Sequence, residues 1–109
     1  MALLEYAFSG GYSPARPFDA AAWRQVATSD NHVRLTMVDQ LVESGQLDGL
    51  IRPQVLELLG PPDGGPYFRD WDFVYWLGPE RGFMSIDSEW LVLRMGSDGR
   101  VSEYRVVRD

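Results

Sequence analysis

Residues 49–62 constrain the fold of this chain more than any other segment, because they contain a complete short helix with its own start and stop. Pro53 is compatible with the first turn of a helix, where the backbone amides have no intrahelical acceptor. Gly60 predicts the left-handed residue that ends the helix, and Pro61 and Pro62 prevent its continuation. About two turns of helix are marginal in isolation, so this helix must dock onto the rest of the chain. Its apolar edge consists of Val55, Leu58 and Leu59.

A longer helix is expected before this one, with Ser29 and Asp30 as cap candidates and an end at Ser44 and Gly45. Its apolar stripe consists of Val33, Met37, Val38, Leu41 and Val42. A short helical turn over residues 19–26 would be capped by Asp19 and attached to the body by Phe18 and Trp23. Residues 9–17 combine glycine and proline without an apolar period, so we predict a flexible lead-in over residues 1–17 and one domain over residues 18–109.

The second half of the chain is rich in strand patterns. Residues 71–77 alternate with bulky side chains on both faces, which favours a central strand; residues 83–87, 90–95 and 100–107 are the other candidates, with a hairpin turn at 96–99. In the last strand Tyr104 and Val106 share a face, and Val101 joins them only if a bulge shifts it. The pattern predicts an α+β domain in which two helices pack on one face of a three- to four-stranded antiparallel sheet, with the other face free.

Composition and charge exclude several classes of function. A chain of 109 residues with 45% apolar residues can form one core without cross-links. The absence of cysteine excludes disulfides, thiolate nucleophiles and cysteine-based zinc sites. A net charge of −6 argues against nucleic acid and anionic lipid as partners. No apolar run is long enough to insert into a membrane, and the first residues do not form an intact signal peptide.

The helix-and-turn signature and the strands that follow it resemble a known bacterial family. The residues concerned are Gly49, Leu50, Val55, Leu58, Leu59, Gly60, Pro62, Tyr75, Trp76, Leu77, Leu91, Val92, Leu93 and Val101. They resemble the SmpA/OmlA (BamE-like) family and, equally, small uncharacterised bacterial proteins of the same superfamily, which also contains the β-lactamase-inhibitor protein. Where that family carries Ser or Thr to cap the second helix, this chain has Ile51, although Gln54 retains the other half of a capping box.

The resemblance implies two helices on one face of an antiparallel sheet and an action by protein contact without catalysis. It also implies a place in the bacterial cell envelope if Met1 stands where an export signal was removed, and the cytoplasm otherwise.

The polar residues do not form a recognisable catalytic motif. His32 is the only histidine and lies in no recognisable relation to a serine nucleophile, so we predict no catalytic, cofactor or metal residue. Two groups of acids could suggest paired-acid hydrolysis or a calcium site, but they flank turns and strand ends, where Asp is common for backbone reasons. The groups are Asp63, Asp70 and Asp72, and Asp87 and Glu89. We expect Arg34 or Arg94 to form a buried ion pair with a carboxylate such as Asp39 or Asp87.

Aromatic residues are concentrated between positions 67 and 90. Because Tyr75 and Trp76 must face opposite sides of a strand, one aromatic set should lie on the sheet face away from the helices, and we predict Trp71, Trp76 and Trp90 as partner-binding residues. The sequence therefore favours a non-enzymatic protein-binding or scaffold module that acts through a sheet face or edge, with homodimerisation as a further use of that surface. The alternatives are a cytoplasmic regulatory or inhibitor domain, and a small-molecule or carbohydrate-binding domain or minor hydrolase that uses the aromatic residues and the carboxylates of residues 63–72.

Overall fold

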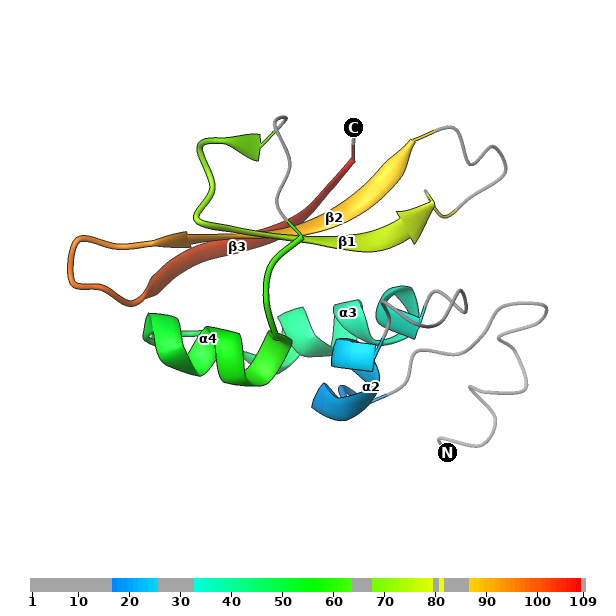
Figure 1. Cartoon of the computed structure of the whole chain (residues 1–109), viewed down its shortest axis with the longest axis horizontal. Helices are drawn as coiled ribbons and strands as arrows, with labels where there is room; N and C mark the ends of the chain where they lie inside the picture. Colours follow the sequence, from blue (N-terminus) through cyan, green and yellow to red (C-terminus); the bar gives the residue numbers. More distant parts are fainter. Residues whose placement is uncertain (1–16, 26–32, 64–67, 80, 82–86, 109) are drawn as a thin grey trace.

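The computed structural model describes residues 17–25, 33–63, 68–79, 81 and 87–108. Three helices precede three strands in these residues: α2 (Ala20–Arg24), α3 (Val33–Ser44), α4 (Arg52–Leu59), β1 (Phe73–Pro79), β2 (Ser88–Met95) and β3 (Val101–Arg108). The helices lie on one side of the sheet (Figure 1). The α+β class and the packing of helices on one face are confirmed. The cap candidates Ser29 and Asp30, the strand expected at 83–87, and His32 lie outside or mostly outside the described residues.

The helix ends follow the local chemistry of the sequence. The Asp19 side chain caps α2 by accepting hydrogen bonds from the amides of Ala21 and Ala22 at 3.0 and 3.3 Å, as predicted. In α4 the Gln54 side chain accepts the Ile51 amide at 3.0 Å, so half of a capping box is present without a hydroxyl at position 51. Gly60 ends α4 with φ +79°, and its amide donates to the Leu56 carbonyl at 2.8 Å.

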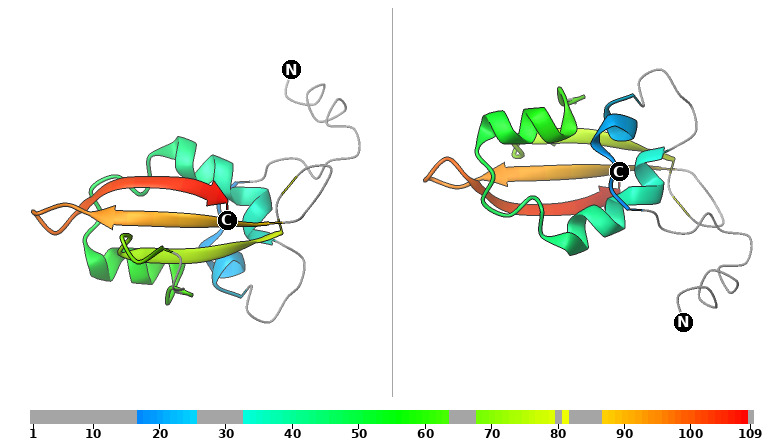
Figure 2. Two further views of the ribbon diagram at one scale, coloured as in Figure 1. Left: turned by 90° about the horizontal axis from the view of Figure 1, so that it is seen from above. Right: turned by 90° about the horizontal axis from the view of Figure 1, so that it is seen from below.

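The sheet is antiparallel with the order β1-β2-β3, so the expectation that the first strand is central is wrong. Figure 2 shows β2 between the other two strands. Both faces of β1 carry buried residues because the helices cover one face and residues 68–72 lie over the other. A register shift opposite Met95 adds one residue to β3, which brings Val101 to the face of Tyr104 and Val106, as expected for a bulge.

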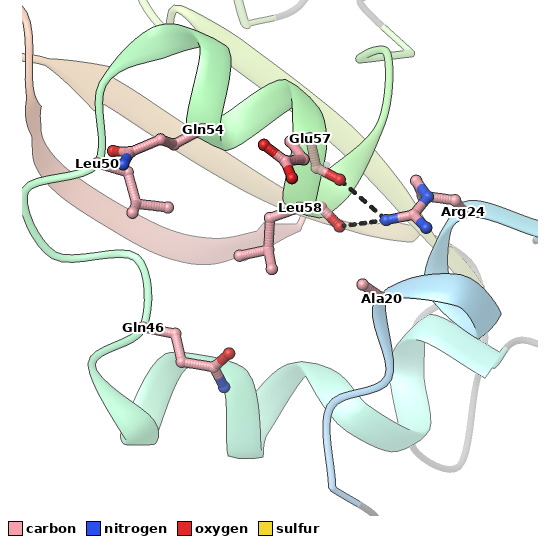
Figure 3. Close-up of a pocket in the computed structure, with 7 residues that line it drawn as sticks. All are labelled: Ala20, Arg24, Gln46, Leu50, Gln54, Glu57 and Leu58. Atoms are coloured by element: carbon pink, nitrogen blue, oxygen red, sulfur yellow. Dashed lines mark hydrogen bonds between the residues drawn. The ribbon is translucent and has the colours of Figure 1, made fainter.

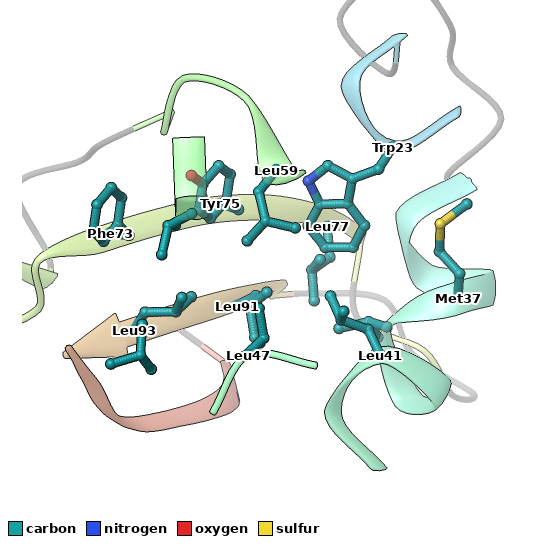
Figure 4. Close-up of a cluster of buried hydrophobic side chains, with 13 residues drawn as sticks. Trp23, Met37, Leu41, Leu47, Leu59, Phe73, Tyr75, Leu77, Leu91 and Leu93 are labelled. Atoms are coloured by element: carbon teal, nitrogen blue, oxygen red, sulfur yellow. The ribbon is translucent and has the colours of Figure 1, made fainter. Parts of the chain in front are cut away.

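The core lies between the sheet and the helices (Figure 4). The sheet contributes Phe73, Tyr75, Leu77, Leu91 and Leu93, and the helices contribute Trp23, Met37, Leu41, Val55 and Leu59, among others. The Trp23 ring meets the Tyr75 ring at 6.2 Å, which fixes the short helix α2 to β1. Burial raises the pKa of Tyr75, whose hydroxyl donates to the Gly60 carbonyl at 2.8 Å.

A buried arginine connects the layers. The Arg34 side chain on α3 donates to the carbonyl oxygens of Trp23 and Trp76 at 3.1 and 2.9 Å, and to Asp63 Oδ2 at 2.9 Å. The same Asp63 oxygen accepts the Trp76 amide at 2.7 Å, and the Asp63 amide donates to the Val74 carbonyl at 2.9 Å. One guanidinium and one carboxylate thus join α2, α3, the segment after α4 and the outer edge of β1.

The ion pairs differ from those predicted, although Arg34 and Arg94 do pair with carboxylates. Arg34 pairs with Asp63 and Arg94 with Glu103, neither with Asp39 or Asp87. Asp39 instead forms an ion pair with Arg81, whose guanidinium also donates a hydrogen bond to Glu89 at 3.0 Å. The sequence alone could not predict which carboxylate pairs with each arginine. The strand register and the position of α3 on the sheet decide which carboxylate lies close enough.

Glu89 is a buried carboxylate at the start of β2, with 1% of its surface exposed. Burial opposes its ionisation, but hydrogen bonds from the side chain and amide of Arg81 outweigh that effect and lower the pKa of Glu89. Because Arg81 also bonds Asp39 on α3, this pair attaches the helical layer to the sheet at the end opposite the β2–β3 hairpin.

Replacing Arg34 with methionine tests the buried cluster. The variant keeps an apolar stem but removes the guanidinium donors to the Trp23 and Trp76 carbonyls. Since the Asp63 side chain is 43% exposed and can regain water, we expect a loss of about 2–3 kcal/mol in unfolding free energy, below the usual cost of breaking a fully buried pair. Urea denaturation measures it, and the exposed Arg69→Met is the control, with a change within about 0.5 kcal/mol. Equal stability of the two variants would contradict the role of Arg34.

Candidate functional site

The candidate site is the sheet surface away from the helices, which we call the tryptophan face: Trp71, Trp76, Trp90, Arg94 and Arg105. Trp76 on β1 lies directly opposite Trp90 on β2, so their side chains share this face while Tyr75 faces the core. All three predicted tryptophans are half-buried. Strand alternation brings Trp76 and Trp90 together, and the segment before β1 brings Trp71 to the same side.

Trp71 is held by two arginines. The guanidinium carbon of Arg94 lies 4.2 Å from the Trp71 ring centroid, and that of Arg105 lies 5.3 Å from it. Both distances allow cation–π attraction. The two arginines come from neighbouring strands, so this contact fixes the α4–β1 connection onto the sheet. Sequence reasoning missed it, although the alternation of Arg94, Glu103 and Arg105 along two adjacent strands was a usable signal.

The expectation of a completely free second face is wrong at the centre of the sheet. Val92 is 0% exposed although it lies on this face, between Trp90 and Arg94 along β2. The Phe68 ring contacts Trp90 at 5.4 Å and the Trp71 ring lies over Arg94, so the segment between them passes over Val92. What is accessible is therefore a rim of half-buried aromatic rings and guanidinium groups rather than an open apolar sheet.

The charge of the tryptophan face is locally balanced. Glu103 accepts a hydrogen bond from Arg94 at 2.8 Å and pairs with Arg105 on its own strand. The hydrogen bond from Arg105 lowers the pKa of Glu103. Two guanidinium groups against one carboxylate leave this surface slightly cationic within a chain of net charge −6.

Asp63 and Asp72, two of the carboxylates that could have suggested hydrolysis or calcium binding, bond backbone amides instead. Asp63 is bound to Arg34 and the Trp76 amide, and Asp72 Oδ2 accepts the Met95 amide at 2.6 Å. Asp70 is exposed. Within the described ranges, no group of three acidic or histidine side chains could hold a metal ion. These contacts explain Asp63 and Asp72 as structural residues.

A second concave feature lies between the helices, on the far side from the sheet (Figure 3). It has a volume of about 650 Å³ and an apolar floor of Leu50, Leu58 and Ala20. Arg24 closes one end by donating to the Glu57 carbonyl at 2.9 Å, where the C-terminal carbonyls of α4 favour a cation. Gln46, Gln54 and Glu57 complete the lining. Sequence analysis assigned Leu58 to a buried edge and did not identify this groove.

Comparisons with protein-family models, curated proteins and solved structures found no match to this chain. The resemblance to the BamE-like family therefore stays a prediction from its residues. In the part of the chain that the structure describes, every helix falls short of the length and apolarity needed to cross a bilayer.

A double-mutant cycle measures the contact that builds the tryptophan face. We expect Trp71→Ala and Arg94→Ala to be coupled by about 0.5–1 kcal/mol of unfolding free energy, the size of a partly exposed cation–π contact. The control cycle pairs Trp71→Ala with Arg100→Ala, because the Arg100 guanidinium bonds the Gly49 carbonyl instead. If both cycles give the same coupling, Trp71 is not held by Arg94.

Proposed function

We propose that this chain is a non-catalytic protein-binding module whose contact surface is the tryptophan face. The observation that carries the proposal is the placement of Trp71 over two guanidinium groups beside Trp76 and Trp90. Trp and Arg are the residue types most enriched among those that dominate interface energetics. Rings held by a sheet lose little side-chain freedom on binding, which lowers the entropic cost of association.

The accessible groups indicate the chemistry of the partner. Arg105 retains 57% of its side-chain exposure and Arg94 retains 41%. A partner with a carboxylate opposite these groups and an apolar or aromatic side chain against the tryptophan rim would complement the surface. The bacterial envelope as the location is the part of this proposal that depends on the family resemblance alone.

A second candidate function is the binding of a small molecule in the groove lined by α2, α4 and the connection between α3 and α4. Its volume is in the range of ligand pockets, and its apolar floor with a few polar groups suits such a ligand. The carboxylates of residues 63–72 do not contribute to its lining. We favour the tryptophan face because four of its five residues lie on strands and Trp71 is held against two of them, whereas the groove is lined by two short helices and a connection.

Site-specific photocrosslinking in cells of the source organism tests the proposal. A photoreactive amino acid at Arg105 samples the tryptophan face, and the same group at Glu57 samples the groove. We expect a discrete crosslinked protein from position 105, absent from position 57, and lost when Trp71→Ala is added because the rim then lacks its central ring.

Three outcomes would contradict the proposal: a partner captured from position 57 alone, a crosslink unaffected by Trp71→Ala, or no crosslink from position 105. A product with twice the mass of the chain indicates self-association and does not support a separate partner.

A further inference from the structure

The two outer edges of the sheet, on β1 and β3, differ in how far their backbone groups are hydrogen-bonded. On β1 the Val74 carbonyl and both the amide and carbonyl of Trp76 are bonded by Asp63 and Arg34. On β3 only the first residue is closed in this way among the described residues: the Val101 amide donates to the Leu50 carbonyl at 2.8 Å, and the Val101 carbonyl accepts the Gly49 amide. The remainder of β3 forms a sheet edge (Figure 2).

Alternation along the ladder identifies the backbone groups that β3 presents outward. Val74 and Trp76 direct their backbone amides and carbonyls away from β2. The backbone hydrogen bonds between β1 and β2 are therefore made by Phe73 with Leu93 and by Tyr75 with Leu91. The intervening β2 residues therefore bond to β3, through the pairs Trp90 with Val107, Val92 with Arg105, and Arg94 with Glu103. It follows that Tyr104 and Val106 direct their amides and carbonyls outward. In the part of the chain that the structure describes, these groups have no backbone partner.

Such an edge is a template for another strand. We propose that it pairs with β3 of a second copy of this chain, antiparallel and centred on Tyr104, to form a continuous six-stranded sheet in the dimer. This inference goes beyond the proposed function and does not require it.

Charge complementarity selects the occupant and the register. Glu103 and Arg105 flank Tyr104 and share the tryptophan face. Pairing centred on Tyr104 puts Glu103 of each copy opposite Arg105 of the other, which gives two opposite-charge cross-strand pairs. Centring on Glu103 or Arg105 would instead oppose like charges. Centring on Val106 would leave Arg105 opposite Val107.

The side chains at the axis fit this arrangement. Tyr104 is half-buried on the helix side of β3, where its hydroxyl donates to Asp48 Oδ1 at 2.5 Å, so its ring is available as an aromatic cross-strand pair. A two-fold axis perpendicular to the sheet keeps the helices of both copies on one side. The tryptophan faces of the two copies then adjoin on the other side through Arg105.

Sedimentation velocity over a concentration series, with the full chain, tests the inference through a charge exchange. We expect a monomer–dimer equilibrium whose dissociation constant rises about tenfold or more with Glu103→Arg alone or Arg105→Glu alone. The double exchange Glu103→Arg with Arg105→Glu should restore the dimer, because each pair again joins opposite charges. Circular dichroism verifies that each variant is folded. If a charge reversal does not fold, the neutral variant Glu103→Gln or Arg105→Gln takes its place, and we expect it to weaken the dimer.

The matched control is Arg69→Glu, an exposed residue outside β3, which should leave the dimer unchanged. A chain that remains monomeric at about 1 mM would overturn the proposal. So would a dimer insensitive to the single variants, or a folded double exchange that stays monomeric. None of these outcomes bears on whether position 105 crosslinks to a different protein, so the two proposals fail separately.

Discussion

The interaction on which the rest of the structure depends is the hydrogen-bonded pair of Arg34 and Asp63 at the outer edge of β1. A guanidinium with only 4% of its residue surface exposed costs free energy to bury, and here its donors reach two carbonyl oxygens and a carboxylate. The Trp23 and Tyr75 rings lie within cation–π distance of the same group, at 4.9 and 5.7 Å. A single side chain therefore defines where α2, α3 and β1 meet.

This arrangement explains why the sheet can stop at three strands on the β1 side. The groups that another strand would use are occupied by side chains and by the Asp63 amide, so β1 is closed without a fourth strand. Phe68 and Trp71, which precede β1, lie on the second face of the sheet, where they contact Trp90 and the arginines.

Local chemistry was sufficient to predict much of the fold. The Asp19 cap and the end of α4 at Gly60 each depend on a few neighbouring residues, and both are confirmed. Val101 reaches the face of Tyr104 only through a bulge, which the sequence offered as the exception to its placement on the other face. The α+β class followed from the change in periodicity between the halves of the chain. The position of β1 could not be predicted, since bulky residues on both faces indicate burial on both sides without indicating whether a strand or a loop covers them.

The candidate site was only partly predictable, because some of its contacts depend on tertiary packing rather than on neighbouring residues. The strand period placed Trp76 and Trp90 on one face, but the position of Trp71 depends on the path of the α4–β1 connection. The partners of Arg34 and Arg94 depend on tertiary distances, so the choice of Asp39 or Asp87 from sequence was wrong. The groove depends on how α2, α4 and the connection before α4 pack together, which no local pattern specifies.

Native-state hydrogen exchange of single amides tests the central claim most directly. If Arg34 and Asp63 close the β1 edge, the Trp76 amide exchanges only when the whole domain unfolds, with a protection factor close to those of Leu91 and Leu93 in β2. In dilute, monomeric protein the outward amides of Tyr104 and Val106 should exchange far faster. A Trp76 amide that exchanges as fast as that of Tyr104 would contradict the account.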